Sequence, residues 1–499
     1  MSCQYEGSLQ SVCVKVIAHN FDRFFKTFEC TRNKEFKLAS EIIQKLYGND
    51  LTKKLYLEGN IKNEHLDYLI NRYTKDLDVQ CFVNCESNDI EERIQQIGNV
   101  ITKFTMTRTR HFDVNNFLRP LCKVQSLILS DTNCSDKSLM TIADVCVDLK
   151  ELDLYNCEKV SDKGLIYLSD KKPALEFLDV YETSVTYKGV ALILKNISTI
   201  SELKFNNVPR AIFEATGLHT TLEESEERTF NLRNLVILNN PMRPESHLTA
   251  ILKVCSTFCP YVNDLTVTEI INEEQLYLCS TFVELKTTRL SLSSVVQPKL
   301  SINELLERRG SQITSLSLTS FALSVDVLAE SCPNLQYISL SSPSFEDTHS
   351  STINFPCLKI LHFRHSVLKS VDGNNLYENI ISCSPNLEEL HIVSSESLES
   401  LTDVILGYPE KLRVLNFSNT IVDIDFIQKV IKKHEKLSTL NIDNSGVSCA
   451  DYDDLMDMVD DMGRSIRIVW ADYSSAIREL YSTDFGLVFQ RLHRHVLKL

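Results

Sequence analysis

The chain has 499 residues, of which 43% are hydrophobic, and a formal net charge of −15. The hydrophobic content excludes a disordered chain, and the acidic charge argues against nucleic acid or an anionic membrane as a partner. No stretch approaches the ~18 consecutive apolar residues of a membrane span, and the start lacks the features of a signal peptide. We therefore expect a cytoplasmic or nuclear protein with reduced cysteines.

The first predicted element is an amphipathic helix within residues 1–50. Leu9, Cys13 and Ile17 recur every four residues and share one helix face, which Val12 and Val16 widen. This pattern resembles the BC-box by which substrate receptors dock on elongin C, the partner of elongin B. The resemblance implies an elongin-binding face in which Leu9 enters a pocket and Cys13 allows close approach. A helix that only caps the first repeat would show the same spacing, so capping stays an alternative.

A second helix is predicted around Leu38, Ile42 and Leu46, which again recur every four residues. The spacing resembles the VHL-box, the cullin-two-binding box of the same receptors, and implies that these three residues contact cullin-two. Ala39 stands where that box prefers proline, so the match is less complete than that of the first helix. Residues 1–50 are thus expected to form a helical adaptor-binding segment.

Residues 51–447 repeat the pattern L-x-x-L-x-L about every 25 residues, in about sixteen units, which is typical of leucine-rich repeats. Each unit predicts a short strand that turns its leucines inward, followed by a helix, so the fold class is α/β. A horseshoe-shaped solenoid is expected, with parallel strands on the concave face and helices on the convex face. The earliest unit is expected at Leu55 and Leu57. The clearest units begin at Leu149, Leu175, Leu335, Leu387, Leu412 and Leu437.

The residues between the strand leucines are expected to line the concave face. Around Leu152 and Leu178 they are acidic and aromatic, and neighbouring strands would stack them into one patch. Aromatic residues anchor interfaces and carboxylates favour a basic peptide, which predicts a substrate-binding patch, although an ordinary polar face is the alternative. The patch comprises Asp153, Tyr155, Phe177, Asp179 and Tyr181. A second candidate group comprises His362, Arg364 and His391.

Residues 448–499 follow the last clear repeat. They contain the acidic stretch 451–461, which predicts a solvated helix face, and an amphipathic run from Ile477 to Leu497. This segment is interpreted as a carboxy-terminal cap or as the beginning of armadillo-like helices.

The order of a BC-box, a cullin-box-like helix and leucine-rich repeats resembles the Zyg-eleven and Zer-one family of cullin-two substrate receptors. The resemblance implies a subunit that docks on elongin C and cullin-two and binds a protein substrate for ubiquitination. The chain contains no recognised catalytic motif, and its 16 cysteines show no metal-ligand spacing, so we expect no enzyme, cofactor or metal. The alternatives are a non-ligase scaffold or inhibitor, and an F-box-type receptor that docks on Skp-one.

Overall fold

The computed structural model describes residues 9–30, 34–110, 112–171, 173–217, 229–238, 245–283, 288–346, 353–365, 376–395, 398, 401–408 and 411–470. They form two compact units, the first comprising residues up to 237 with 246–263, and the second comprising 238–245 with the residues from 264 onward. Each unit is described by itself.

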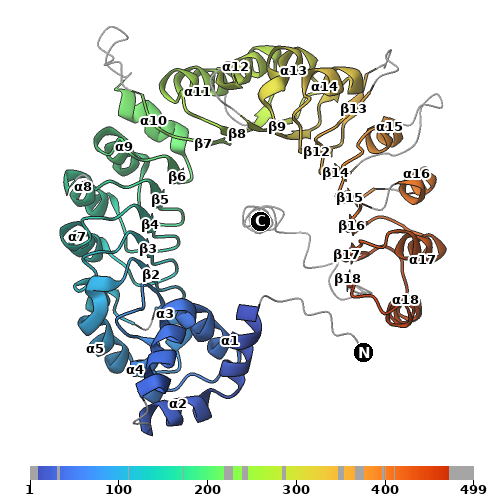
Figure 1. The fold of residues 1–499 in the computed structure, drawn as a ribbon. Helices are drawn as coiled ribbons and strands as arrows, with labels where there is room; N and C mark the ends of the chain where they lie inside the picture. The colour runs from blue at the N-terminus through green and yellow to red at the C-terminus, as the bar shows by residue number, and fades with distance from the viewer. Residues whose placement is uncertain are drawn as a thin grey trace. The chain divides into compact units, whose positions relative to one another are not determined.

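Unit 1 begins with three helices, α1 (Leu9–His19), α2 (Phe21–Cys30) and α3 (Lys34–Leu57) (Figure 1). The strand expected at Leu55 and Leu57 is wrong, because both residues lie in the last turn of α3. Gly59 follows in the left-handed conformation with φ 68°, and Asn60 N donates to Leu55 O at 3.0 Å. The helix therefore runs through the Leu-x-Leu pair, and this glycine cap ends it directly afterwards.

The repeats of unit 1 form a parallel six-stranded sheet in the order β1 to β6. Phe104, Leu127, Leu152, Leu178 and Leu203 occupy paired positions along β2 to β6, and all are buried against the helices. Figure 1 shows these strands on one side of the unit and helices α5 to α10 on the other. The strands of this sheet are β1 (Asp76–Asp78), β2 (Lys103–Thr105), β3 (Ser126–Ile128), β4 (Glu151–Asp153), β5 (Phe177–Asp179) and β6 (Glu202–Lys204), and β7 (Asn234–Ile237) is a further strand of the unit.

Carboxylates connect neighbouring helices of unit 1. Asp136, at the start of α7, accepts hydrogen bonds from the N and Oγ of Ser161, both at 2.7 Å, and from Gly164 N at 3.2 Å. A Cβ on Gly164 would lie 2.8 Å from Asp136 Oδ1, so this close approach requires glycine. The helices after α3 are η1 (Asn63–His65), α4 (Leu66–Leu69), η2 (Val79–Phe82), α5 (Ser87–Ile97), η3 (Gly98–Val100), α6 (Val114–Leu118), α7 (Asp136–Val145), α8 (Asp162–Lys171), α9 (Tyr187–Asn196), α10 (Val208–Thr216) and α11 (Glu245–Phe258).

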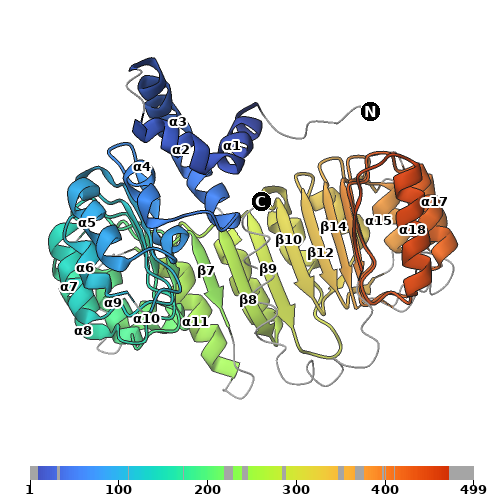
Figure 2. The same cartoon turned by 90° about the horizontal axis from the view of Figure 1, so that it is seen from below.

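The strands of unit 2 are also parallel and in register, with Leu316, Ile338, Leu361, Leu390 and Leu415 at paired positions. Figure 2 shows β8, β9, β10, β12 and β14 side by side. The strands are β8 (Asp264–Ile270), β9 (Arg289–Ser294), β10 (Ser315–Thr319), β11 (Ala322–Leu323), β12 (Tyr337–Ser341), β13 (Ser344–Phe345), β14 (Ile360–Arg364), β15 (Glu389–Val393), β16 (Val414–Asn416), β17 (Thr439–Asn441) and β18 (Arg467–Val469). The helices are α12 (Glu273–Val283), α13 (Asn303–Arg309), η4 (Gly310–Gln312), α14 (Val325–Ser331), α15 (Leu376–Ser382), α16 (Thr402–Gly407), α17 (Ile424–Lys433) and α18 (Cys449–Asp461).

The acidic stretch 451–461 lies in α18, which begins after the N-cap Ser448 and buries Leu455 and Val459. The run from Ile477 to Leu497 lies outside the described residues. None of the helices in the described part of the chain is long and apolar enough to cross a membrane.

Candidate protein-binding surfaces

Helix α1 is described from Val14 onward at the level of its side chains. Among these, Val14 and Ala18, which are not part of the predicted elongin-binding face, are buried, with exposed fractions of 7% and 1%. Val16, which belongs to the predicted face, is 58% exposed, and Ile17 is half-buried. The side chains of Leu9, Val12 and Cys13 lie outside the described residues, although their backbone belongs to α1. The part of the predicted face that the structure describes is therefore partly accessible to a partner.

Helix α3 carries the predicted cullin-binding residues on its outer side. Leu38, Ile42 and Leu46 are 60%, 49% and 59% exposed, and we call them the α3 stripe. The opposite side of the helix faces the repeats, where Gln44 Nε2 donates to Tyr68 O at 2.7 Å and Tyr68 Oη donates to Ser40 O at 3.3 Å. Because this side already holds the helix, folding leaves about half of each aliphatic side chain of the stripe exposed to water.

Helix α2 covers the start of the repeats. Phe21 and Phe25 are buried, and their ring centroids lie 4.9 and 5.0 Å from that of His65. Both rings also meet Tyr68 edge-on, at 5.9 and 6.4 Å. Terminal repeats require a cap over their open core. In this chain the aromatic side chains of α2 provide that cover.

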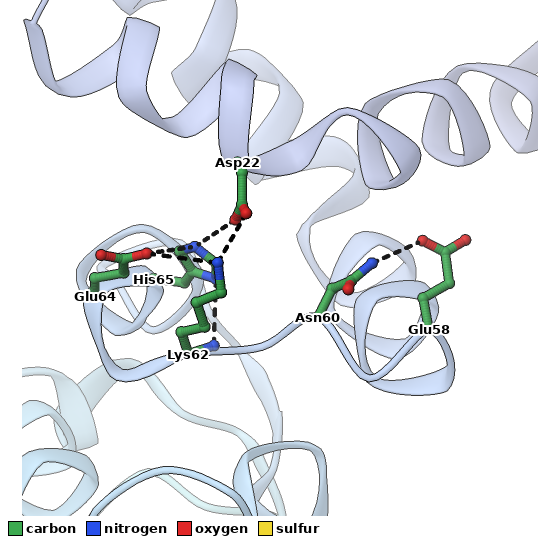
Figure 3. A network of polar contacts seen from close by, with 6 residues as sticks. All are labelled: Asp22, Glu58, Asn60, Lys62, Glu64 and His65. Atoms are coloured by element: carbon green, nitrogen blue, oxygen red, sulfur yellow. Dashed lines mark hydrogen bonds and ion pairs between the residues drawn. The ribbon is translucent and has the colours of Figure 1, made fainter.

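A polar network joins α2 to the segment that follows α3 (Figure 3). Lys62 Nζ lies 2.8 Å from Asp22 Oδ2, and His65 Nε2 lies 3.3 Å from Asp22 Oδ1 and 3.6 Å from Glu64 Oε1. Burial lowers the pKa of His65, while Asp22 and Glu64 act in the opposite direction. Lys62 N donates to His65 Nδ1 at 3.3 Å, so we assign the ring proton to Nε2, which points toward Asp22.

Asp22, Glu64 and His65 also form a group of metal-type ligands. Lys62 Nζ lies 2.8 Å from Asp22 and 3.8 Å from Glu64, so an ammonium group already supplies the positive charge there. Hydrogen bonding to this lysine holds the pKa of Asp22 below its usual value. We therefore interpret the network as a set of ion pairs that holds α2 against the first repeat.

The aromatic part of the predicted substrate patch gathers on β4, β5 and the turns that follow them. The rings of Tyr155 and Tyr181 stack with centroids 6.2 Å apart and planes at 12°. Lys204 Nζ lies 4.9 Å from the ring centroid of Phe177, a cation–π contact that the sequence analysis did not foresee. All three aromatic side chains are half-buried, and each keeps part of its surface in water.

The two aspartates of the patch have a local structural role. Asp153 Oδ1 accepts from Tyr155 N and Asp179 Oδ1 accepts from Tyr181 N, both at 2.9 Å. These bonds form Asx turns, which position the tyrosines and end the strands after three residues. Asp179 is only 4% exposed, so its contribution to the surface is small. The same side-chain-to-backbone bond occurs at Asp78, Asn416 and Asn441.

A repeated backbone feature decides the architecture. In eleven repeats of the described residues, spread over both units, the residue four positions after the first inward strand residue has a positive φ, between 46° and 60°. Parallel strands, inward leucines and this turn recur with the same spacing. The chain has the leucine-rich-repeat fold. Proteins of this architecture present an extended strand face for protein–protein interaction. The left-handed positions are Arg108, Asp131, Asn156, Glu182, Glu269, Ser320, Ser342, His365, Ser394, Asn419 and Asn444.

Comparison with known proteins adds little beyond the architecture of this leucine-rich-repeat protein. No protein-family model matches the chain. It is 28% identical over 134 residues to the putative F-box/LRR-repeat protein 23 of Arabidopsis thaliana, a match that spans 27% of this chain and 29% of that relative.

Two solved structures show a distant likeness to the chain. A chain in the crystal structure of the Rad7 and Elc1 complex in yeast is 15% identical, with a TM-score of 0.36 over 87% of this chain and 93% of that one. The leucine-rich-repeat protein LIC12759 of Leptospira interrogans is 13% identical, with a TM-score of 0.34 over 83% of this chain and 91% of that one. Similarities at this level carry no argument about partners.

Proposed function

We propose that this leucine-rich-repeat protein is the substrate-recognition subunit of a cullin-two–elongin BC ubiquitin ligase, resembling the Zyg-eleven and Zer-one receptors. The supporting observation is the α3 stripe, in which Leu38, Ile42 and Leu46 are each about half or more exposed on one face of a helix. Single exposed leucines are common on proteins, whereas aligned aliphatic side chains are typical of surfaces that bind a partner.

The alternative, that the amino-terminal helices only cap the first repeat, does not account for the exposed apolar residues, because other residues form the cap. A helix that only covers the first repeat turns its apolar face inward. Here Phe21 and Phe25 of α2 provide the cover, while Val16 of α1 and the α3 stripe are accessible. These outer apolar positions are therefore surplus to capping and available for elongin C and cullin-two.

In this proposal the protein contributes no catalytic group. Its helical segment would hold elongin C with elongin B and cullin-two, and its repeats would hold the target. Ubiquitin transfer would then gain from proximity, because a tethered target raises the local concentration of its lysines at the transfer site. The cytoplasm, the nucleus or both would be the site of action.

The stacked tyrosines of unit 1 are the proposed target-binding surface. Tyr155 and Tyr181 offer aromatic surface near Glu151, an arrangement that suits a basic protein segment, whereas the ring of Phe177 already holds Lys204. A fluorescent lysine-rich peptide should bind the full chain more tightly than its glutamine counterpart. Tyr155→Ala with Tyr181→Ala should weaken that binding, whereas Tyr261→Ala, an exposed tyrosine outside these strands, should not. If the double variant binds the lysine-rich peptide as tightly as Tyr261→Ala does, the stacked tyrosines are not the target-binding surface.

The decisive experiment is co-purification of the full chain with elongin B and elongin C. Wild type is compared with Leu9→Ser/Cys13→Ser and with Val16→Asp, and the matched control is Met140→Asp, an exposed apolar residue (44%) on α7. We expect a complex with wild type and with the control, and its loss in the α1 variants while circular dichroism remains unchanged. If elongin C is not recovered with wild type, the receptor proposal fails and a non-ligase scaffold or inhibitor remains.

The name of the Arabidopsis relative favours one further candidate, an F-box-type receptor. An F-box protein would dock on Skp-one instead of elongin C. Including Skp-one as a second bait in the same experiment separates the two candidates directly. Recovery of Skp-one without elongin C would replace the elongin proposal by the F-box one.

A further inference from the structure

A cluster of nitrogen-rich side chains lies on the strand face of unit 2. His362 of β14 is paired in register with Ser339 of β12 on one side and with His391 of β15 on the other. The two imidazole centroids are 3.9 Å apart, and the ring of Tyr337 lies 5.2 Å from that of His362. Arg364 follows two residues later on β14 and therefore projects from the same face. We call His362, Arg364 and His391 the histidine cluster.

Hydrogen-bond donors outnumber carboxylates around this cluster. His362 Nδ1 is inaccessible to solvent and has no hydrogen-bond partner among the described residues. Lys299 Nζ donates to Ser342 O at 2.6 Å, directly after the strand that carries Ser339, and belongs to none of the ion pairs in the described part of the chain. The carboxylate facing the cluster is Glu389, 3.5 Å from His391 Nε2.

We propose that the histidine cluster binds an anionic group, a carboxylate or a phosphoryl group, carried by a protein segment that lies across β12, β14 and β15. Arg364 brings a permanent positive charge and a planar guanidinium to this face, and the adjacent rings of His362 and His391 add imidazole nitrogens beside it. This inference rests on the proposed function in one respect, namely that the anionic group belongs to a target protein.

The local charges predict that this binding depends on pH. Burial lowers the pKa of His362 well below its ordinary value of 6.5, and His391 and Arg364 act in the same direction. A bound anion would oppose that repulsion and favour the protonated ring, so binding should take up a proton. The groups that face His362 are Tyr337 on β12, Arg364 on its own strand, and His391 with Glu389 on β15.

The test is fluorescence anisotropy with the full chain and three labelled peptides of one sequence, containing glutamates, glutamines or phosphoserines. The glutamate or phosphoserine peptide should bind and the glutamine peptide should not, and the tighter of the two anionic peptides identifies the source of the charge. Arg364→Gln should weaken binding about ten- to hundredfold, as expected for the loss of hydrogen bonds to a charged group. Arg289→Gln is the matched control, because Arg289 lies on β9 of the same sheet, exposed and ion-paired with Asp264 at 3.5 Å.

The glutamate peptide is the probe for pH, because its carboxylates stay ionised above about pH 5.5 whereas phosphoserine titrates near pH 6. Its affinity should rise as the pH falls below 6.5, and His362→Ala/His391→Ala should remove that rise. Equal binding of the glutamine peptide, or equal losses in the two arginine variants, would overturn the proposal. Each variant is also tested for co-purification with elongin C, which should be unchanged. If wild type binds the anionic peptides but does not co-purify with elongin C, the ligase proposal is refuted and the anion-binding proposal stands.

Discussion

Replacing the α3 stripe by alanine should separate partner binding from folding. Leu38, Ile42 and Leu46 are 60%, 49% and 59% exposed, so about half of the packing of each side chain is lost, while alanine, the most favourable residue in a helix, returns a few tenths of a kcal/mol. The free energy of unfolding should therefore fall by roughly 2–4 kcal/mol, about as much as on removing other half-exposed apolar side chains. Binding should fall in addition. Covering the exposed parts of the three side chains would contribute roughly 2.5–5 kcal/mol, at ~1.5–3 kcal/mol for each fully buried side chain.

That energy corresponds to a loss of roughly two to three and a half orders of magnitude in affinity. The assay, which rests on the proposed function, is biolayer interferometry of the chain with elongin B and elongin C on immobilised cullin-two, beside urea unfolding of each variant. Met140→Ala/Ile166→Ala is the matched control, since these exposed apolar residues (44% and 43%) lie on α7 and α8. The reasoning is refuted if the triple alanine variant binds cullin-two as tightly as this control, or if it unfolds at clearly lower urea than the control.

Three other outcomes follow from the structure. Gly164→Ala should destabilise the protein by about 1–3 kcal/mol in urea, because the new Cβ would lie 2.6 Å from Leu139 Cδ1, whereas Gly48→Ala in α3 meets nothing within 4 Å and should not destabilise it. The pKa of buried His65 is lower in the folded chain than in the unfolded chain, so the unfolded chain takes up a proton first and stability should fall as the pH drops below 6.5. The melting temperature of His65→Gln should fall less than that of wild type over the same range. Identical pH profiles for the variant and wild type would contradict this assignment. Burial raises the pKa of Cys146, Cys259 and Cys279 to about 12, so iodoacetamide followed by peptide mass mapping should find these thiols unmodified in the native protein, while exposed Cys122, Cys357 and Cys449 react; equal labelling would contradict their burial.

The core of the repeats was predictable because it depends on spacing alone. A leucine pair two residues apart must face the same side of a strand, and pairs such as Leu152/Leu154 and Leu440/Ile442 are fully buried as expected. Strands β1, β9 and β18 were missed because the leading apolar position of the pattern is polar in each of them. Thr74, Thr287 and Ser465 stand there. At Thr74 the buried hydroxyl is satisfied by Leu69 O and Asn71 N.

The two aspartates of the predicted patch illustrate a different limit. The sequence indicates an acidic residue between strand leucines, but it does not say whether the carboxylate faces a ligand or bonds to its own backbone. In the structure Asp153 and Asp179 close Asx turns two residues ahead. The recurrence of Asp or Asn at this position was a usable signal for turns, since both residues favour that local bond. The aromatic stack depends on strand register, which no single repeat specifies.

The amino-terminal helices show how burial separates two explanations that share one sequence pattern. A four-residue apolar spacing predicts an amphipathic helix but not what covers its face. Residues 38, 42 and 46 lie on the same helix as Ser40 and Gln44, yet the polar residues face inward and contact Tyr68, while the aliphatic ones face outward. A helix required only for capping would gain from the reverse arrangement, because exposed aliphatic surface favours association. We infer that the outward stripe is retained for a partner, and the alanine variants above measure what that partner gains from it.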